Sequence, residues 1–241
     1  MKTLNQKLTT FSFALLFLFA FSISTTFAQE VRSLSNFESI SSAGGFDIKI
    51  IKSSKNEVKI EGADADLLEK LETDVKGNRL RIGIKKGMSW KSYGSNKITI
   101  TVYHTQKLGK LSMAGSGAME WDGELYSTRL DINVAGSGKV CGRVAVSSLE
   151  ANIAGSGKIC LKGAATEQYV SIAGSGDYKA EDLKTQNTDI RISGSGDAEV
   201  YVTKVLEAKV SGSGDIRYDT GGNDLDKLNS KVSGSGKVRK N

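Results

Sequence analysis

The stretches "VAGSGKVCG" at 134–142 and "IAGSGKICL" at 153–161 are nearly identical and begin nineteen positions apart. The Gly-Ser-Gly triplet inside them recurs seven times, at spacings of 18 to 22 residues. Its copies occupy 115–117, 136–138, 155–157, 174–176, 194–196, 212–214 and 234–236. A near-constant period of this length indicates a repeat architecture, in which each repeat is one supersecondary unit.

Residues on both sides of each triplet alternate between apolar and polar. Two residues after the second glycine stand Met119, Val140, Ile159, Tyr178, Ala198, Ile216 and Val238. The next position is mostly charged and holds Glu120, Cys141, Cys160, Lys179, Glu199, Arg217 and Arg239. Two residues before the first glycine stand Met113, Val134, Ile153, Ile172, Ile192, Val210 and Val232. A period of two on each side predicts a half-buried strand before and after every triplet.

A strand, a glycine corner and a strand in every repeat predict an all-β, single-domain β-solenoid, a parallel β-helix-like stack of about seven coils. Coils spaced about 4.8 Å apart would stand roughly 34 Å tall and share one continuous core. Glycine on both sides of the serine provides positive φ or close backbone approach at each corner. The predicted corner residues are Gly115, Gly117, Gly136, Gly138, Gly155, Gly157, Gly174, Gly176, Gly194, Gly196, Gly212, Gly214, Gly234 and Gly236.

Other interpretations of the triplet fit less well. A flexible Gly/Ser linker would lie in unpatterned polar sequence, whereas every copy is flanked by alternating apolar residues. The spacing matches neither the phosphate-binding loop G-x-x-x-x-G-K-[ST] nor the hydrolase elbow G-x-S-x-G. We therefore expect no catalytic residue among these serines.

The part of the chain from 29 to 108 lacks the triplet but is also rich in strand patterns. Strands are predicted at 46–52, 56–62, 78–86 and 97–103, with a turn at Lys76-Gly77-Asn78. A short helix is predicted at 64–71, with Asp64 as its N-cap. We expect these elements to continue the same sheets as irregular early coils, within the same domain as the repeat coils at 109–241, and to cap one end of the stack.

The first 28 residues have the pattern of a secretory signal peptide. Lys2 and Lys7 precede an apolar run from Phe11 to Ile23, and small residues follow it up to Ala28. The alternative, a membrane anchor, would need about 20 apolar residues. The sequence thus predicts an exported protein of the periplasm, the outer surface or the medium, with no transmembrane segment after cleavage.

The net charge of +6 is small and dispersed. Nucleic-acid binding would favour a basic stripe with interleaved aromatics, so no nucleic-acid partner is expected. The chain has 27 glycines and no proline, so glycine must supply its tight turns.

The stretches "FESISSAGGFDIKI" and "ITITVYHTQKLGKLSMAGSG", followed by serial "AGSG" and "SGSG" coils, resemble the bacterial family of putative autotransporter adhesins with a head GIN domain, common in Bacteroidetes. The resemblance covers nearly the whole chain after residue 28. It implies a β-helix-like fold and an adhesin role, but no catalytic residues. Nothing in the sequence resembles the membrane translocator barrel that a self-sufficient autotransporter carries.

Cys141 and Cys160 occupy the same column of adjacent coils. A spacing of about 4.8 Å lies within the Cα range of a disulfide, and export would permit the bond. The alternative is two free thiols side by side, because parallel neighbours direct their Cβ atoms alike.

Directly after three consecutive triplets stand Asp177, Asp197 and Asp215. Stacked carboxylates could bind Ca²⁺, or could be a solvated charged face balanced by Lys179 and Arg217. Because the nine-residue calcium repeat is absent, the sequence favours the second alternative and predicts no metal and no cofactor. His104, the single histidine, is expected to be an ordinary surface residue near a strand end.

Trp90 and Tyr93 lie in the loop "GMSWKSYGSNK" at 87–97. Exposed aromatics there could contact a ligand, or they could fold back over the end of the stack.

Three functional hypotheses follow. The first is a non-enzymatic envelope or surface protein whose stacked faces bind a glycan, an envelope protein or another copy. The second is a β-helix enzyme acting on polysaccharide, with the aspartate column as its only candidate site. The third is a structural or lipid-associated periplasmic factor. The incomplete last coil exposes an edge, but its basic ending "KVRKN" disfavours stacking of identical ends, so we expect a monomer or a side-by-side oligomer.

Overall fold

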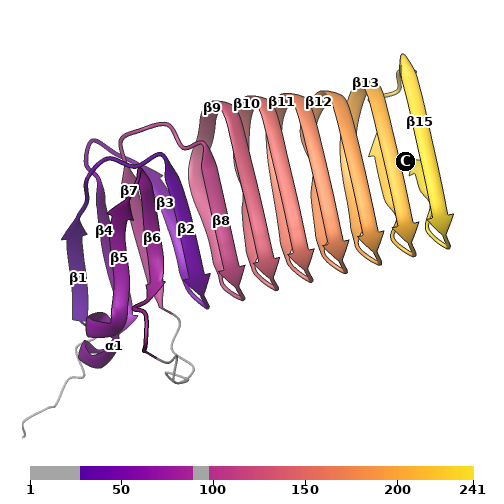
Figure 1. The fold of residues 1–241 in the computed structure, drawn as a ribbon. Helices are drawn as coiled ribbons and strands as arrows, with labels where there is room; N and C mark the ends of the chain where they lie inside the picture. The colour runs from indigo at the N-terminus through magenta and orange to yellow at the C-terminus, as the bar shows by residue number, and fades with distance from the viewer. Residues whose placement is uncertain (1–27, 89–97) are drawn as a thin grey trace, which may run out of the picture.

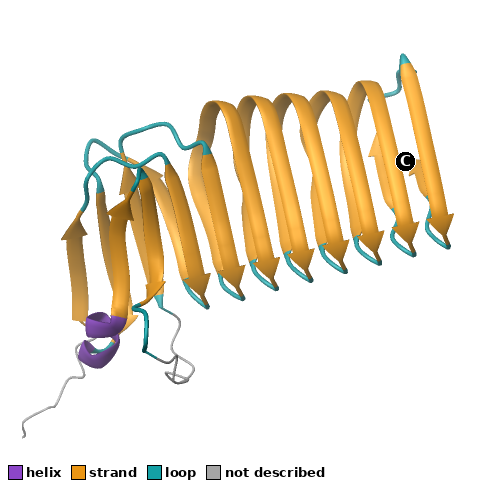
Figure 2. Ribbon diagram, viewed as in Figure 1, coloured by secondary structure: helices purple, strands orange, loops and turns teal. Residues whose placement is uncertain are grey.

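The computed structural model describes residues 28–88 and 98–241. Strands make up 74% of this part and are wound into a β-solenoid of about seven turns (Figure 1). The predicted fold class is therefore confirmed. A single short helix lies at the N-terminal end of the stack, as Figure 2 shows.

Five long strands make the regular coils. They are β9 (Ala118–Gly136), β10 (Lys139–Gly155), β11 (Lys158–Gly174), β12 (Asp177–Gly194) and β13 (Asp197–Gly212). Each strand bends midway, so its first half lies on one face of the solenoid, here called face A, and its second half on the opposite face, face B. The bends line one long edge of the stack, the bend edge, and the Gly-Ser-Gly corners line the other, the corner edge.

Neighbouring coils pair in parallel and in register, because the repeats have nearly equal lengths. Lys139 pairs with Lys158 at the start of a coil, and Gly155 pairs with Gly174 at its end. The last coils continue both faces with short strands. They are β14 (Ile216–Asp219) and β16 (Val238–Lys240) on face A, and β15 (Lys227–Gly234) on face B.

The corners show why glycine is required twice. At Gly194 φ is +130°, a backbone conformation that residues other than glycine rarely adopt. At Gly196 an added Cβ would lie 2.3 Å from the carbonyl oxygen of Gly176 in the preceding coil. The serine between them keeps the hydrogen-bond ladder intact, since the Ser195 amide donates to the Gly174 oxygen at 2.9 Å.

The core fills the space between the two faces. The apolar columns predicted from the period of two are buried in every coil up to β13, with Tyr178, Val140 and Ile159 at 0% exposure. Outward positions between them remain exposed or half-exposed. One apolar cluster runs from Phe37 to Val238, so the stack has one core.

The N-terminal part joins the same sheet but not in chain order. Its elements are β1 (Ala28–Ser33), β2 (Ser39–Gly44), β3 (Asp47–Lys52), β4 (Glu57–Ala63), α1 (Ala65–Lys70), β5 (Leu71–Lys76), β6 (Arg79–Ile84), β7 (Thr99–His104) and β8 (Lys110–Gly115). β2 and β3 lie directly beside β8 and β9, while β7 and β6 are inserted on their outer sides. β1 and β5 close this end as antiparallel edge strands.

A further corner at Gly44–Phe46 precedes the seven triplets. Gly44 pairs with Gly115 and Asp47 pairs with Ala118, so Phe46 takes the place of the second glycine. The Phe46 side chain is buried, at 0% exposure.

The helix prediction is confirmed, since the Asp64 carboxylate accepts a hydrogen bond from the Leu67 amide at 2.8 Å. The prediction of a surface His104 is wrong. This side chain is only 2% exposed, and its Nδ1 lies 2.8 Å from the Gln106 carbonyl oxygen. It ends β7 with its ring turned inward, and burial lowers its pKa.

Candidate functional site

An exposed tyrosine on face B marks the best candidate site. Tyr169 of β11 is 47% exposed, although large apolar or aromatic side chains are mostly buried in this fold. It occupies an outward column that is otherwise acidic or polar, between Glu150 on β10 and Asp189 on β12. These residues line a depression of about 310 Å³ together with Asn152, Val170, Ser171 and Arg191.

The parallel register builds this site. Because Glu150, Tyr169 and Asp189 are equivalent positions of successive coils, their Cα atoms lie about 4.8 Å apart along the stack. The neighbouring outward column adds Asn152 and Arg191 in the same way. The side chains therefore project from three strands onto one face, and their spacing is fixed by the sheet.

Ion pairs hold the charged groups of the depression. Glu150 accepts hydrogen bonds from Arg129 at 2.6 Å and from the amide of Asn152 at 3.1 Å. Asp189 accepts two from Arg191, at 2.9 and 3.2 Å, and this carboxylate raises the pKa of the guanidinium. The polar groups thus have defined positions around the ring.

The ring itself is oriented by its own strand. The Tyr169 hydroxyl donates to Glu167 at 3.2 Å, and the nearby carboxylate raises the pKa of the phenol, which stays neutral at physiological pH. A neutral aromatic face beside an amide, carboxylates and a guanidinium offers apolar contact and directional hydrogen bonding together. This is the combination that a sugar ring needs, since it has apolar CH faces and a rim of hydroxyls.

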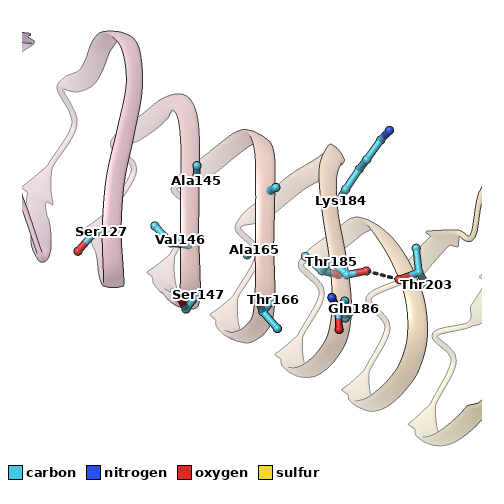
Figure 3. Close-up of a pocket in the computed structure, with 11 residues that line it drawn as sticks. Ser127, Ala145, Val146, Ser147, Ala165, Thr166, Lys184, Thr185, Gln186 and Thr203 are labelled. Carbon is cyan, nitrogen blue, oxygen red and sulfur yellow. Dashed lines mark hydrogen bonds between the residues drawn. The ribbon is translucent and has the colours of Figure 1, made fainter.

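A second depression, of about 450 Å³, follows the bend edge across β9 to β13 (Figure 3). Small apolar side chains, hydroxyls and one amide line it from successive coils, and Lys184 stands at its margin. The Thr203 hydroxyl donates to the Thr185 carbonyl oxygen at 2.9 Å. Tyr126, 62% exposed, stands in register with Ala145 beside this groove. No aromatic side chain is among the residues that line it.

Comparison with protein-family models matches residues 36–222 to the family described as "Putative auto-transporter adhesin, head GIN domain". The chain belongs to this family. A search of the curated proteins finds no match.

Solved structures show the same architecture as this head GIN family member. A putative adhesin from Bacteroides fragilis NCTC 9343 is 25% identical, with a TM-score of 0.76 over 90% of this chain and 98% of that one. A structure from Parabacteroides distasonis ATCC 8503, described as a putative lipid binding protein, is 26% identical, with a TM-score of 0.69 and the same coverage. A putative adhesin from Parabacteroides merdae ATCC 43184 is 22% identical, with a TM-score of 0.72 over 90% and 97% of the two chains.

The aspartate column predicted from the sequence lies on face A beside the corner edge and has structural partners. Asp197 accepts the Asp215 amide at 2.8 Å, and Asp215 accepts the Lys237 amide at 2.9 Å. Asp177 lies 3.8 Å from Lys158. Lys179 and Arg217, expected to balance this column, instead both pair with Glu199.

No group of three or more His, Cys, Asp or Glu side chains in residues 28–88 and 98–241 is placed to hold a metal ion. Within those residues no helix is long and apolar enough to cross a membrane.

Cys141 and Cys160 are paired as a disulfide, with their Cα atoms 4.6 Å apart. They join β10 to β11 on face A. Trp90 and Tyr93, the predicted ligand-contact loop, lie outside the described residues. The signal peptide predicted at residues 1–28 lies outside them too, except for Ala28, which begins β1.

Sequence reasoning missed Tyr169, although its column contained a signal. Asp131, Glu150, Asp189 and Glu207 are the equivalent residues of the other coils. A solvated face would be expected to carry a charged or polar residue at this outward position, as the neighbouring coils do, and not an aromatic one.

Proposed function

We propose that this head GIN family protein is an exported, non-enzymatic surface module that binds a glycan on face B around Tyr169. The observation that carries the proposal is the 47% exposed tyrosine ring set among Glu150, Asn152, Asp189 and Arg191 in one depression. A pyranose ring stacked on Tyr169 would place its hydroxyls near these donors and acceptors.

The open shape of the stack supports an extended ligand. Because equivalent positions repeat about every 4.8 Å, a linear polymer lying along the axis meets a regular series of side chains. Carboxylates at Asp131 and Glu207 extend the column beyond the depression on both sides. The neighbours described as putative adhesins agree with a binding role.

Cleavage of the glycan is less well supported. An inverting hydrolase needs two carboxyl groups about 6.5 to 9.5 Å apart, one of them protonated as a general acid. Glu150 and Asp189 stand two coils apart, but each is already held in an ion pair with an arginine. The depression therefore suits binding better than acid catalysis.

A lipid-associated role is the second candidate. One neighbour is described as a putative lipid binding protein. On face B beside the corner edge, a shallow trough of about 320 Å³ has Ala114, Ala135, Ala154 and Ala173 among its lining residues. An acyl chain could lie along this row of methyl groups.

A glycan array probed with the mature protein separates these candidates. Retention of defined glycans without shortening supports binding, whereas released fragments indicate an enzyme. Lipid in organic extracts of the purified protein, found by mass spectrometry in the absence of glycan binding, would favour the second candidate. Protease digestion of intact and lysed cells tests location, because a surface module must be cleaved before lysis.

A further inference from the structure

Two neighbouring outward columns of face B change their residue types at the same coil. The first column holds Ser112, Asn133, Asn152 and Ser171, and then Arg191, Lys209 and Lys231. The second column, beside the corner edge, holds Ala114, Ala135, Ala154 and Ala173, and then Ser193, Ser211 and Ser233. From β12 onward, face B therefore presents cations beside hydroxyls, where the earlier coils present neutral side chains beside methyl groups.

The changed residues line a groove of about 310 Å³, here called the basic groove. Its lining residues include Arg191, Lys209, Lys231, Ser193, Ser211 and Ser233. Ser171 and Arg191 line both the basic groove and the depression around Tyr169. A ligand in that depression can therefore extend into the basic groove without leaving face B.

The positive charge of the basic groove is only partly balanced by carboxylates. Lys209 and Lys231 are exposed, and neither forms an ion pair with any residue that the structure describes. Glu207, two residues before Lys209 on β13, is paired with Lys227 at 3.6 Å. The groove thus keeps two ammonium groups that are not neutralised by the protein.

The stacking of these cations is unfavourable without an anion. Arg191, Lys209 and Lys231 are equivalent positions of successive coils, so their Cα atoms lie about 4.8 Å apart. Like charges opposite one another on neighbouring strands are destabilising. An anion bound between the two lysines would replace this repulsion by attraction.

The serine column completes a set of hydrogen-bond donors. The side chains of Ser193, Ser211 and Ser233 are exposed beside the cations. An ammonium group offers three donors and no acceptor, and a hydroxyl adds one donor. Hydrogen bonds from such groups to an ionised oxygen are the strong ones, so this donor set suits a carboxylate or a sulfate ester.

We propose that the basic groove binds the carboxylate or sulfate groups of an acidic polysaccharide. The inference rests on the proposed glycan binding around Tyr169 for the nature of the polymer, and makes that ligand more specific. Because the cations lie on three successive coils, a linear polymer along the stack meets more than one of them. Phospholipid headgroups are poorer occupants, since they offer no pyranose ring to Tyr169.

Three polymers with one glucan backbone test the requirement for charge: dextran, carboxymethyl dextran and dextran sulfate of matched length. In calorimetric titration of the mature protein, at least one charged polymer should bind about tenfold or more tighter than dextran. The tighter of the two charged polymers identifies the anion. Added salt should weaken its binding, because salt screens exposed charges.

Paired variants place this binding in the basic groove. Lys209→Gln with Lys231→Gln should weaken binding of the charged polymer about tenfold or more. The matched control, Lys184→Gln with Lys204→Gln, removes two exposed lysines at the bend edge and the same net charge. It should change the affinity less than about twofold.

Tyr169→Ala, titrated in parallel, separates this inference from the proposed function. Binding that requires Tyr169 but not the two lysines would overturn the basic groove and leave glycan binding in place. Binding that requires the lysines but not Tyr169 would support the groove and contradict the glycan site. Equal affinity for dextran and both charged polymers, or no binding of either charged polymer, would also overturn the groove. Lysine-dependent sedimentation with phosphatidylglycerol vesicles, without binding of a charged dextran, would assign the groove to a membrane surface and overturn the proposal too.

Discussion

Replacing Gly196 by alanine tests the physical reason for the repeated triplet. Gly196 is the second glycine of the corner between β12 and β13. An alanine Cβ at this position would lie 2.3 Å from the Gly176 carbonyl oxygen and 2.7 Å from Cγ2 of Ile172. The first obstacle is backbone of the neighbouring coil, which cannot rotate away, so the two coils must separate locally.

Overpacking of a well-packed site costs about 1 to 3 kcal/mol, and a backbone obstacle places Gly196→Ala at the upper end, about 3 kcal/mol. Two control variants isolate this cost. Ser195→Ala changes an exposed residue of the same triplet and should cost less than about 0.5 kcal/mol. Gly123→Ala has φ of +72° but no atom within 4 Å of the added Cβ, so it should cost only the conformational term, about 1 to 2 kcal/mol.

Urea unfolding followed by circular dichroism gives these differences from the shift in midpoint. Because each coil contacts only its neighbours, hydrogen exchange should also show faster opening in β12 and β13 than in β9. If Gly196→Ala unfolds at the same urea concentration as Ser195→Ala, the close approach of coils is not what requires glycine there.

Three further predictions concern single interactions. Thiol titration of the exported, unreduced protein should find no free thiol, and two titratable thiols would contradict the disulfide. Replacing both Cys141 and Cys160 by serine should lower the free energy of unfolding by up to about 3 kcal/mol, as expected for a disulfide that closes a loop of this size. Tyr178→Phe removes the buried hydroxyl that donates to Gln168 Oε1 at 3.0 Å, and should lower the free energy of unfolding in urea by about 1 to 3 kcal/mol. Adding Gln168→Leu should recover part of that stability, because the amide oxygen left without a donor is then removed. No recovery would show that the unpaired amide is not the cause of the loss. Lys179 and Arg217 lower the pKa of Glu199 from its ordinary value of 4.5. The stability that this carboxylate contributes is therefore complete above pH 4.5 and is lost as the pH falls through the lower pKa of the folded state. Glu199→Gln should make the thermal midpoint fall less steeply at acid pH, and an unchanged fall would show that other groups cause it.

The repeated residues predicted the coils because a solenoid imposes the same demand at every turn. Corner glycines recur since each faces the carbonyl of the preceding coil, and inward residues recur since each faces the same core. The order of the N-terminal strands in the sheet could not be predicted from the repeat. Placing β7 between β3 and β4 depends on long-range pairing, and so does the Gly44–Phe46 corner, in which Phe46 takes the place of the second glycine.

The candidate site, unlike the coils, lies where the sequence departs from the repeat. Tyr169, Glu150 and Asp189 share a column, which the sequence could reveal, but the ion pairs with Arg129 and Arg191 depend on side-chain conformations that the repeat does not specify. The burial of His104 also depends on tertiary packing at the end of β7. A single histidine in the sequence gives no sign of that packing.

Glycan binding at Tyr169 is tested most directly by calorimetric titration of the best glycan from the array into three proteins. They are the parent chain, Tyr169→Ala and, as a matched control, Tyr126→Ala, which removes the other highly exposed tyrosine of the described residues. Loss of one stacked aromatic ring should weaken binding about tenfold or more for Tyr169→Ala and leave Tyr126→Ala within about twofold of the parent. Equal affinities for the parent and Tyr169→Ala would contradict the assignment of this depression as the binding site.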